Sequence, residues 1–137
     1  MLAACEDGGV AGREQQLRDA FAALERGELD VVEALFAPDA KWRAPDPEWD
    51  CLSRAQILRV MRENRAKGRL TGEIEQVVEL DEGHTVVRFH PASREPDGIP
   101  MDASGTRWVL LSFGEDGLVA EMKGFPDHAS AAAYAGG

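Results

Sequence analysis

The chain has 137 residues, of which 44% are hydrophobic, and its formal net charge at pH 7 is −10. This length suits one domain, which would bury roughly two thirds of the surface that its unfolded chain exposes. The excess of acidic residues argues against nucleic acid or an anionic membrane as a partner, because both require a basic protein surface.

Two further features of the composition concern the cellular compartment. No apolar run approaches the roughly 20 residues that span a bilayer, so we expect no membrane partner. The two cysteines, Cys5 and Cys51, fall in an expected terminal arm and an expected loop, which is not the pattern of a disulfide framework. A reducing, cytoplasmic setting is therefore predicted.

The first part of the chain predicts an arm and two helices. Residues 1–12 mix glycine, alanine and acidic residues without periodicity, which is typical of a flexible arm. Apolar residues then recur at helical spacing at Leu17, Ala20, Phe21 and Leu24. A helix is expected from about Arg13 to Arg26, with Gly27 ending it. Asp30 is expected to cap a second short helix, which Pro38 ends.

The next segment predicts a strand, a loop and a third helix. Residues 41–44 are expected to be extended and to lead into the loop of the stretch "WRAPDPEWDC", where two prolines fix the backbone. Ser53 and Gln56 have the spacing of a capping box, and the apolar pattern after them continues a helix to Gly68.

From residue 73 the hydrophobic period changes from near 3.6 to 2, which indicates strands. "EIEQVVEL" and "HTVVRFH" flank the turn "DEG", and "TRWVLLSF" and "LVAEMKGF" flank the turn "GEDG". In the first of these strands, Glu73, Glu75 and Glu79 are expected opposite Ile74, Val78 and Leu80. Asp127 is expected to cap a last, alanine-rich helix.

This order of elements predicts an α+β fold. Two helices, a strand and a helix come first, and antiparallel hairpins and a short helix follow, so the helices should cover one face of a curved antiparallel sheet. The sequence shows no internal repeat and no long linker. One domain is therefore expected over residues 13–137.

Four stretches carry a family likeness, namely "FAALERGELDVVEALFAPDAKWRAP", "RAQILRVM", "GTRWVLLSFGEDGLVAEMKGF" and "DHASAAAYAG". Together they resemble the SnoaL-like branch of the nuclear-transport-factor-two-like superfamily, over about residues 13–136. The resemblance implies a cone-shaped α+β barrel whose curved sheet wraps the N-terminal helices around an apolar pocket, and a homodimer through the outer sheet face. It implies no fixed chemistry, because members include ketosteroid isomerases, polyketide cyclases, epoxide hydrolases, dehydratases and non-catalytic binding modules.

The sequence lacks the complete set of catalytic polar residues of two enzyme types in this superfamily. The tyrosine and the two acids of ketosteroid isomerases fall on Ala20, Ala44 and Val109, which cannot move a proton, so that constellation is absent. The Asp, Arg, Asp arrangement of the epoxide hydrolases finds no match for both acids. Arg88 or Arg107 could supply its arginine, and the acids would have to come from loops, at Asp46, Asp50 or Asp102.

Among the predicted strands, "HTVVRFH" carries the strongest candidates for catalytic residues. Its period of 2 puts His84, Val86, Arg88 and His90 on one face and Thr85, Val87 and Phe89 on the other. In the isomerase register the first set faces the pocket, where His90 would be a general base and Arg88 an anion stabiliser. A slip by one residue would instead turn both polar residues to the outer face. Asp46 is an alternative base beside the pocket.

In the strand "TRWVLLSF" both faces are largely apolar, which predicts a central strand covered on both sides. We expect Trp108 to pack in the core or at a dimer interface, and Arg107 to lie near the opening of the pocket. Glu121 and Lys123 are expected on a solvated face.

The sequence therefore predicts a protein whose pocket binds a hydrophobic or aromatic metabolite. Catalysis by acid-base chemistry, of the isomerase, cyclase or dehydratase type, is one hypothesis, and a non-catalytic binding or dimeric interaction module is the other. No metal-ligand spacing, phosphate loop or nucleophile elbow appears, so neither a metal nor a cofactor is expected. The residues expected to contact the ligand are Trp42, Trp49, Phe21, Met61, Val109, Leu111 and Met122.

Overall fold

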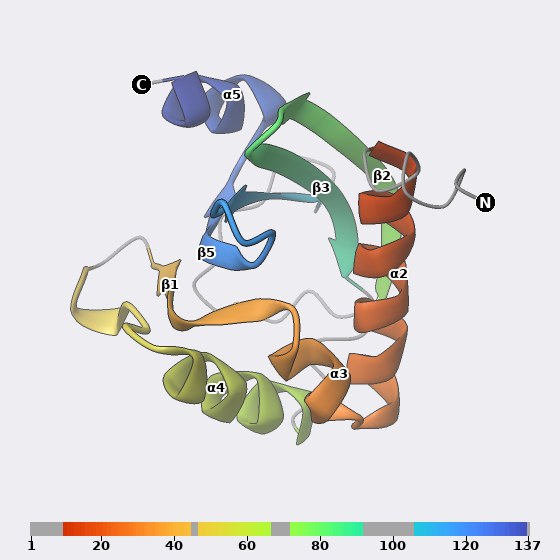
Figure 1. Cartoon of the computed structure of the whole chain (residues 1–137), viewed down its shortest axis with the longest axis vertical. Helices are drawn as coiled ribbons and strands as arrows, with labels where there is room; N and C mark the ends of the chain where they lie inside the picture. The colour runs from red at the N-terminus through yellow and green to blue at the C-terminus, as the bar shows by residue number, and fades with distance from the viewer. Residues whose placement is uncertain (1–9, 45–46, 67–71, 92–105, 137) are drawn as a thin grey trace.

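The computed structural model describes residues 10–44, 47–66, 72–91 and 106–136 of the chain (Figure 1). In chain order its elements are α2 (Val10–Arg26), α3 (Leu29–Glu33), β1 (Phe36–Arg43), the 3-10 helix η1 (Pro47–Trp49), α4 (Arg54–Ala66), β2 (Gly72–Asp81), β3 (His84–Pro91), β4 (Arg107–Phe113), β5 (Val119–Phe125) and α5 (His128–Gly136). The α+β fold and the order of helices and strands are those predicted from the sequence.

The strands form one five-stranded sheet in the order β1-β5-β4-β3-β2. Neighbours from β5 to β2 are antiparallel, but β1 pairs with β5 in parallel, so the prediction of an antiparallel sheet was wrong at this edge. The chain enters β1 beside the turn that leads into β5, where the Val119 amide donates to the Leu35 carbonyl at 2.9 Å. Both strands therefore leave the same end of the sheet and run in the same direction.

The strand β1 also starts earlier than predicted. It begins at Phe36, which is 2% exposed, whereas the sequence suggested a helix until Pro38. Burial against β5 outweighs the local helical pattern here, and a proline is tolerated because β1 is an edge strand. The predicted capping role of Asp30 was wrong too, since α3 follows Glu28 and has no side-chain cap.

The predicted alternation along β2 fails after Glu75. The pairing of β2 with β3 shifts between Ile74 and Gln76, which is the mark of a β-bulge. Val77 consequently packs with Ile74 in the inner core, while Leu80 packs on the other face of the sheet. One extra residue is enough to exchange the two faces of the remaining strand.

Three predicted helix ends are confirmed. Gly27 has φ +83 and follows α2, in a conformation that favours glycine. The Ser53 hydroxyl accepts from the Gln56 amide at 3.2 Å at the start of α4. The Asp127 carboxylate accepts from the Ser130 amide at 2.7 Å at the start of α5.

The sheet has a hydrophobic core on each face. The larger core lies on the inner face, between the sheet and the helices α2, α3 and α4. The smaller one, on the outer face, consists of Val86, Leu110, Phe125 and Ala131 under α5. Figure 1 shows β2 and β3 bending around the space beside α2, with α5 at the far edge.

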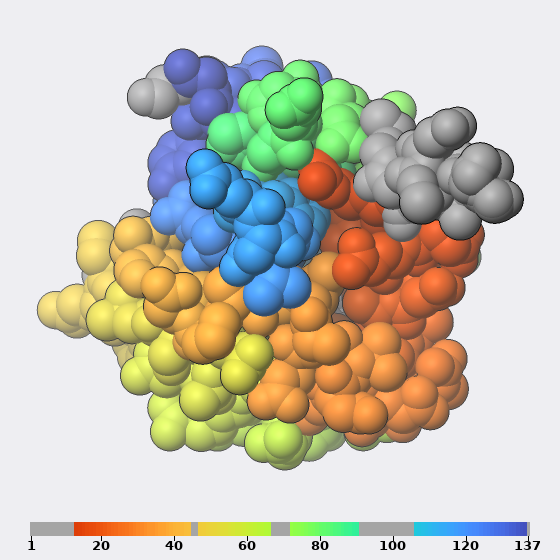
Figure 2. Space-filling view, in the orientation of Figure 1, coloured from red at the N-terminus to blue at the C-terminus, as the bar shows by residue number. Residues whose placement is uncertain are grey.

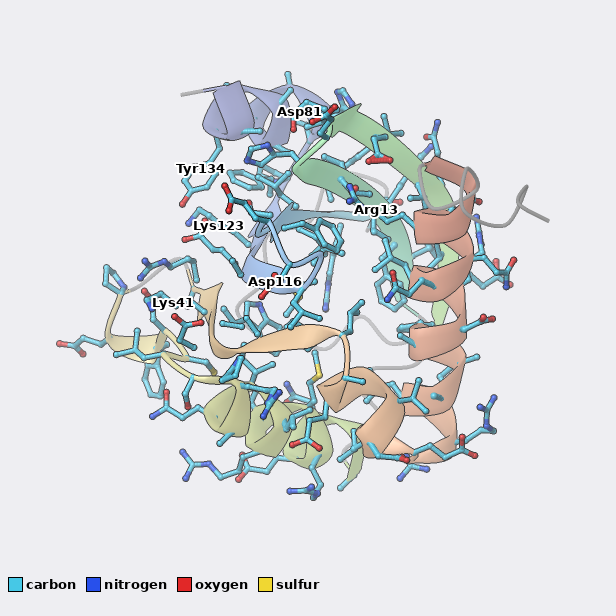
Figure 3. The ribbon with its side chains drawn as sticks, viewed as in Figure 1. Arg13, Lys41, Asp81, Asp116, Lys123 and Tyr134 are labelled. Atoms are coloured by element: carbon cyan, nitrogen blue, oxygen red, sulfur yellow. The ribbon has the colours of Figure 1, made fainter. Side chains whose placement is uncertain are left out.

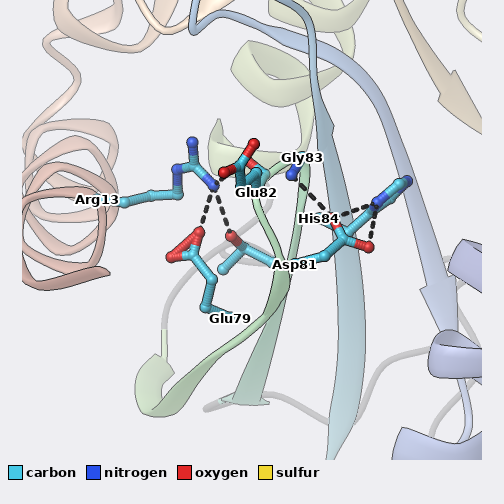
Figure 4. A network of polar contacts seen from close by, with 7 residues as sticks. Arg13, Glu79, Asp81, Glu82, Gly83 and His84 are labelled. Carbon is cyan, nitrogen blue, oxygen red and sulfur yellow. Dashed lines mark hydrogen bonds and ion pairs between the residues drawn. The ribbon is translucent and has the colours of Figure 1, made fainter. Parts of the chain in front are cut away.

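Arg13 fastens the first turn of α2 to the β2–β3 hairpin (Figure 4). Its guanidinium donates to the Glu79 carboxylate at 2.6 Å and to the Glu82 carbonyl at 3.1 Å. It also lies 4.1 Å from the centroid of the Phe113 ring. These contacts join the helix to both β2 and β4. They lie at the end of the sheet that carries the β4–β5 turn, which Figure 2 shows in blue against β1 in orange.

Candidate functional site

A cavity of about 150 Å³ lies between the inner face of the sheet and the helices. Its described wall is built from α2, α3, β1, α4 and all four remaining strands. The residues that line it are Leu17, Ala20, Phe21, Leu24, Val32, Leu35, Phe36, Trp42, Met61, Ile74, Val87, Phe89, Arg107, Val109, Leu111, Met122 and Gly124. All but Arg107 are apolar or aromatic.

The regular spacing of residues along the helices and strands places these side chains around the cavity. On α2 the residues at positions 17, 20, 21 and 24 form one helical face. On the strands every second residue faces inward, which selects positions 87 and 89, positions 107, 109 and 111, and positions 122 and 124. The phenyl rings of Phe21 and Phe89 meet edge to face, with centroids 4.9 Å apart.

Most of the residues expected to contact a ligand do line this cavity. Phe21, Trp42, Met61, Val109, Leu111 and Met122 are in its wall. Their role in binding remains a prediction, since proximity to a cavity is not binding.

Trp49 is the exception among them. It stands on η1 with 76% of its surface exposed and is not among the residues of the wall. The bridge between Trp42 and Cys51, with amide to carbonyl distances of 3.0 Å in both directions, closes the loop at its base and leaves Trp49 at its tip. The prediction that both tryptophans form the apolar wall was therefore wrong for Trp49.

Arg88 and His90 face away from the cavity. Val87 and Phe89, their neighbours on β3, line the wall, so the alternation of the strand turns Arg88 and His90 to the outer face. The Arg88 guanidinium lies 3.3 Å from the Glu75 carboxylate and 5.3 Å from the centroid of the Trp108 ring. Of the two registers that the sequence allowed, the structure has the one that turns both polar residues to the outer face, so the catalytic roles predicted for Arg88 and His90 in the cavity find no support. Burying two aliphatic or aromatic side chains costs less than burying two polar ones.

The candidate acids do not add a proton-transfer group to the described wall. Asp46 and Asp102 lie outside the described residues. Asp50 is absent from the wall, and its carboxylate accepts from the Ala44 amide at 2.7 Å and from Arg43 at 3.0 Å. The Ala44 hydrogen bond, and then Arg43, lower the pKa of Asp50. Asp50 is therefore an ionised structural group.

Asp50 belongs to a polar cluster on the outer side of the β1–β5 edge. Arg43 also donates to Glu121 at 2.8 Å, and the Tyr134 hydroxyl of α5 donates to the same carboxylate at 3.0 Å. Lys123 and Tyr134 lie on this side of the sheet (Figure 3), with the ammonium 5.7 Å from the ring centroid. The cluster holds the loop after β1 in place, and with it Trp42.

Among the residues that the structure describes, Arg107 is the charged one in the cavity wall. It is 2% exposed, and it shares the inward face of β4 with Val109 and Leu111. Its Cα lies opposite that of Phe89 on β3. The sequence placed Arg107 only near the opening of the pocket, although the same period of 2 that put Val109 and Leu111 in the wall also included it.

Two other kinds of site find no support in the described part of the chain. Among the described residues there is no group of three or more His, Cys, Asp or Glu side chains close enough to hold a metal ion. Cys51 is 7% exposed, and burial raises the pKa of its thiol, which disfavours the nucleophilic thiolate. The described helices include none that is long and apolar enough to cross a membrane.

The sequence of residues 17–122 matches the family model of the SnoaL-like domain. The chain belongs to the SnoaL-like family. No curated protein sequence gives a significant match. The expected likeness to SnoaL-like proteins is thereby confirmed.

Solved structures share the fold of this SnoaL-like domain at low sequence identity. The epoxide hydrolase/cyclase-like enzyme SalBIII, which acts in pyran ring formation in the polyether salinomycin, has a TM-score of 0.65 at 14% identity, over 86% of this chain and 92% of that one. A candidate polyketide cyclase from Sinorhizobium meliloti has a TM-score of 0.62 at 19% identity, and the match covers 81% of this chain and 94% of that one. A candidate ketosteroid isomerase from Kribbella flavida has a TM-score of 0.59 at 20% identity, and the match covers 83% of this chain and 77% of that one.

These likenesses establish the fold and not the chemistry of this SnoaL-like domain. Of the positions that align with isomerase catalytic residues, Ala20 and Val109 lie in the cavity wall, and Ala44 lies just after β1. The wall therefore carries methyl and isopropyl groups at two places where the sequence comparison located a tyrosine and an acid.

Proposed function

We propose that this SnoaL-like domain binds a compact hydrophobic or aromatic small molecule in the cavity on its inner face. The observation that carries the proposal is the wall itself, in which apolar and aromatic side chains surround about 150 Å³ and a single charged residue, Arg107, appears among those described. Ligand pockets in proteins have this composition, with mostly hydrophobic walls and few polar groups that fix orientation.

The volume limits the size of the ligand. An apolar cavity of roughly 150 Å³ accommodates one benzene-sized molecule. A ligand of one ring with small substituents therefore fits the described cavity, whereas a fused polycyclic ketone would require the helices to move apart. Filling an empty cavity restores the dispersion contacts that its lining atoms lack, so a molecule of this size gains free energy on entry.

Binding without turnover is the better supported of the two functions considered. Near neutral pH, proton transfer is mostly carried out by histidine and carboxylate side chains. The described wall contains neither, and Arg88 and His90 lie on the outer face. An isomerase, cyclase or dehydratase activity, as suggested by the names of structural neighbours, would need a proton acceptor from outside the described wall.

The test is a calorimetric and thermal-shift titration with neutral one-ring probes, namely benzene and toluene. We expect saturable binding and a raised melting temperature, because a ligand that binds only the folded state stabilises it. Val109→Phe should abolish the shift, since the added ring occupies the cavity.

The matched control is Val78→Phe. Val78 pairs with Val86 on the outer face, so the same substitution there leaves the cavity unchanged. If the neutral probes give no shift with the wild-type protein, or if Val109→Phe binds them as well as the wild type does, the proposed function is wrong.

A further inference from the structure

The position of Arg107 narrows the class of ligand. We propose that the cavity takes a one-ring aromatic or alicyclic carboxylate, and that the guanidinium of Arg107 binds its carboxylate group. This inference rests on the proposed function, because it concerns the same cavity. It starts from a charged side chain that is 2% exposed and lies in a wall otherwise made of apolar and aromatic groups.

The guanidinium group is well suited to bind a carboxylate. It is planar, it is charged at every physiological pH, and its fork of N–H groups matches the two oxygens of a carboxylate. It has five N–H donors, of which a bidentate carboxylate uses two. Arg107 can therefore bind the ligand and keep its contacts with the protein.

Because the protein as a whole is negatively charged, the positive charge of Arg107 is important for binding an anion. The net charge is −10, so an anion approaching the protein meets an unfavourable field over most of the surface. No described residue of the cavity wall is acidic, and a charge pair enclosed by apolar groups interacts far more strongly than one in water. An anionic ligand is thus favoured at Arg107 although it is disfavoured elsewhere.

The ring of the proposed ligand can pack against apolar residues beside Arg107. Phe89, whose Cα lies opposite that of Arg107, meets Phe21 edge to face, and both rings line the cavity. Gly124, on the neighbouring strand β5, also lines the cavity, and it leaves room there because it has no side chain. A molecule whose carboxylate is attached directly to one ring can contact Arg107 and the two phenyl rings at the same time.

The experiment compares benzoate with benzamide, a neutral molecule of nearly the same shape, by isothermal titration calorimetry. With the wild-type protein we expect benzoate to bind roughly 10- to 100-fold more tightly, the range typical of hydrogen bonds to charged groups. Cyclohexanecarboxylate should follow benzoate. Arg107→Met should remove the preference for the acid and leave the affinity for benzamide nearly unchanged.

The matched control is Arg88→Met, which removes the same charge from the outer face of the adjacent strand. It should keep the preference for benzoate, since the effect belongs to the cavity and not to the net charge. In the wild-type protein, benzoate but not benzamide should shift the NMR signal of the Arg107 side-chain N–H. This readout remains usable if Arg107→Met does not fold.

The outcomes separate this inference from the proposed function. If the wild type binds benzamide as tightly as benzoate, or if Arg88→Met and Arg107→Met lose the preference equally, the inference is overturned while the cavity remains a binding site. If benzoate, benzamide and the neutral hydrocarbons all fail to bind, the proposed function itself is wrong.

Discussion

Asp50 shows how a single side chain positions the cavity wall without touching it. Its carboxylate is 10% exposed, accepts from the Ala44 amide and pairs with Arg43, which in turn binds Glu121 on β5. The loop after β1 is thereby held against the sheet, and Trp42 at its base is held in the wall. In the proposed function, Asp50 therefore acts only through this positioning.

We expect Asp50→Ala to lower the free energy of unfolding by about 1–3 kcal/mol, because it leaves the Ala44 amide and Arg43 without their acceptor. Urea unfolding at neutral pH measures this change. Ligand affinity should fall less than in Val109→Phe. Equal stability of Asp50→Ala and the wild type would show that the cluster is only a surface feature.

The same residue predicts a pH dependence with a defined sign. The pKa of Asp50 is lowered in the folded state, first by the Ala44 hydrogen bond and then by Arg43. Its contribution to stability is therefore complete above the pKa of an unfolded aspartate, about 3.9, and is lost as the pH falls through the lower, folded value. Asp50→Asn, which keeps an acceptor but cannot ionise, should lack this part of the acid sensitivity.

Among the elements, α2 contributes most to the enclosure of the cavity. Four of its side chains line the wall, and Arg13 joins its first turn to the β2–β3 hairpin and to Phe113. Arg18 adds a second polar contact, from its guanidinium to the Ile74 carbonyl of β2 at 3.0 Å, and the apolar contacts of the helix have no preferred direction. Arg13 and Arg18 together therefore fix the angle of the helix on the sheet as well as its position.

Replacing Arg13 by methionine, which keeps an apolar stem, should lower the free energy of unfolding by about 1–3 kcal/mol through the loss of a charged hydrogen bond and a cation–π contact. Hydrogen exchange should speed up in the first turns of α2 and in the β2–β3 hairpin. Gln15→Met, which removes only an exposed contact with Asp19, is the control. Unchanged exchange in the hairpin would contradict the role given to Arg13.

In the folded molecule, the helix α5 covers part of the outer face of the sheet, over Val86, Leu110 and Phe125. Beside this core, Trp108 contacts the His128 ring, with centroids 5.5 Å apart, and the Arg88 guanidinium. Half-buried aromatic and arginine side chains are enriched at protein interfaces.

The expectation of a homodimer through this face can be tested by light scattering at micromolar concentration, which should give twice the chain mass of 14.9 kDa. Arg88→Glu should produce monomers, because a two-fold axis brings the reversed charge to the interface twice. Arg59→Glu, on the exposed side of α4, carries the same charge change and should remain dimeric. A monomeric wild type would refute the expectation directly.

Much of the fold could be predicted because it depends on local periodicity. The spacing of apolar residues on α2, the glycine after it, and the caps at Ser53 and Asp127 each act within a few residues. The same holds for β4, whose alternation placed Val109 and Leu111 together. Six of the seven residues expected to contact a ligand line the described cavity, and Trp49 does not, because aromatic character alone does not distinguish a cavity wall from an exposed loop.

The pattern of residues alone predicts the order of the elements and, on β3 and β4, the two alternating sets of side chains. Which set faces inward depends on the packing of the folded chain, as β3 shows by turning Val87 and Phe89 to the cavity and Arg88 and His90 away from it. The parallel pairing of β1 and the bulge in β2 depend on the same packing. A period of 2 defines two equivalent faces, and only contacts with helices and neighbouring strands make one of them the interior.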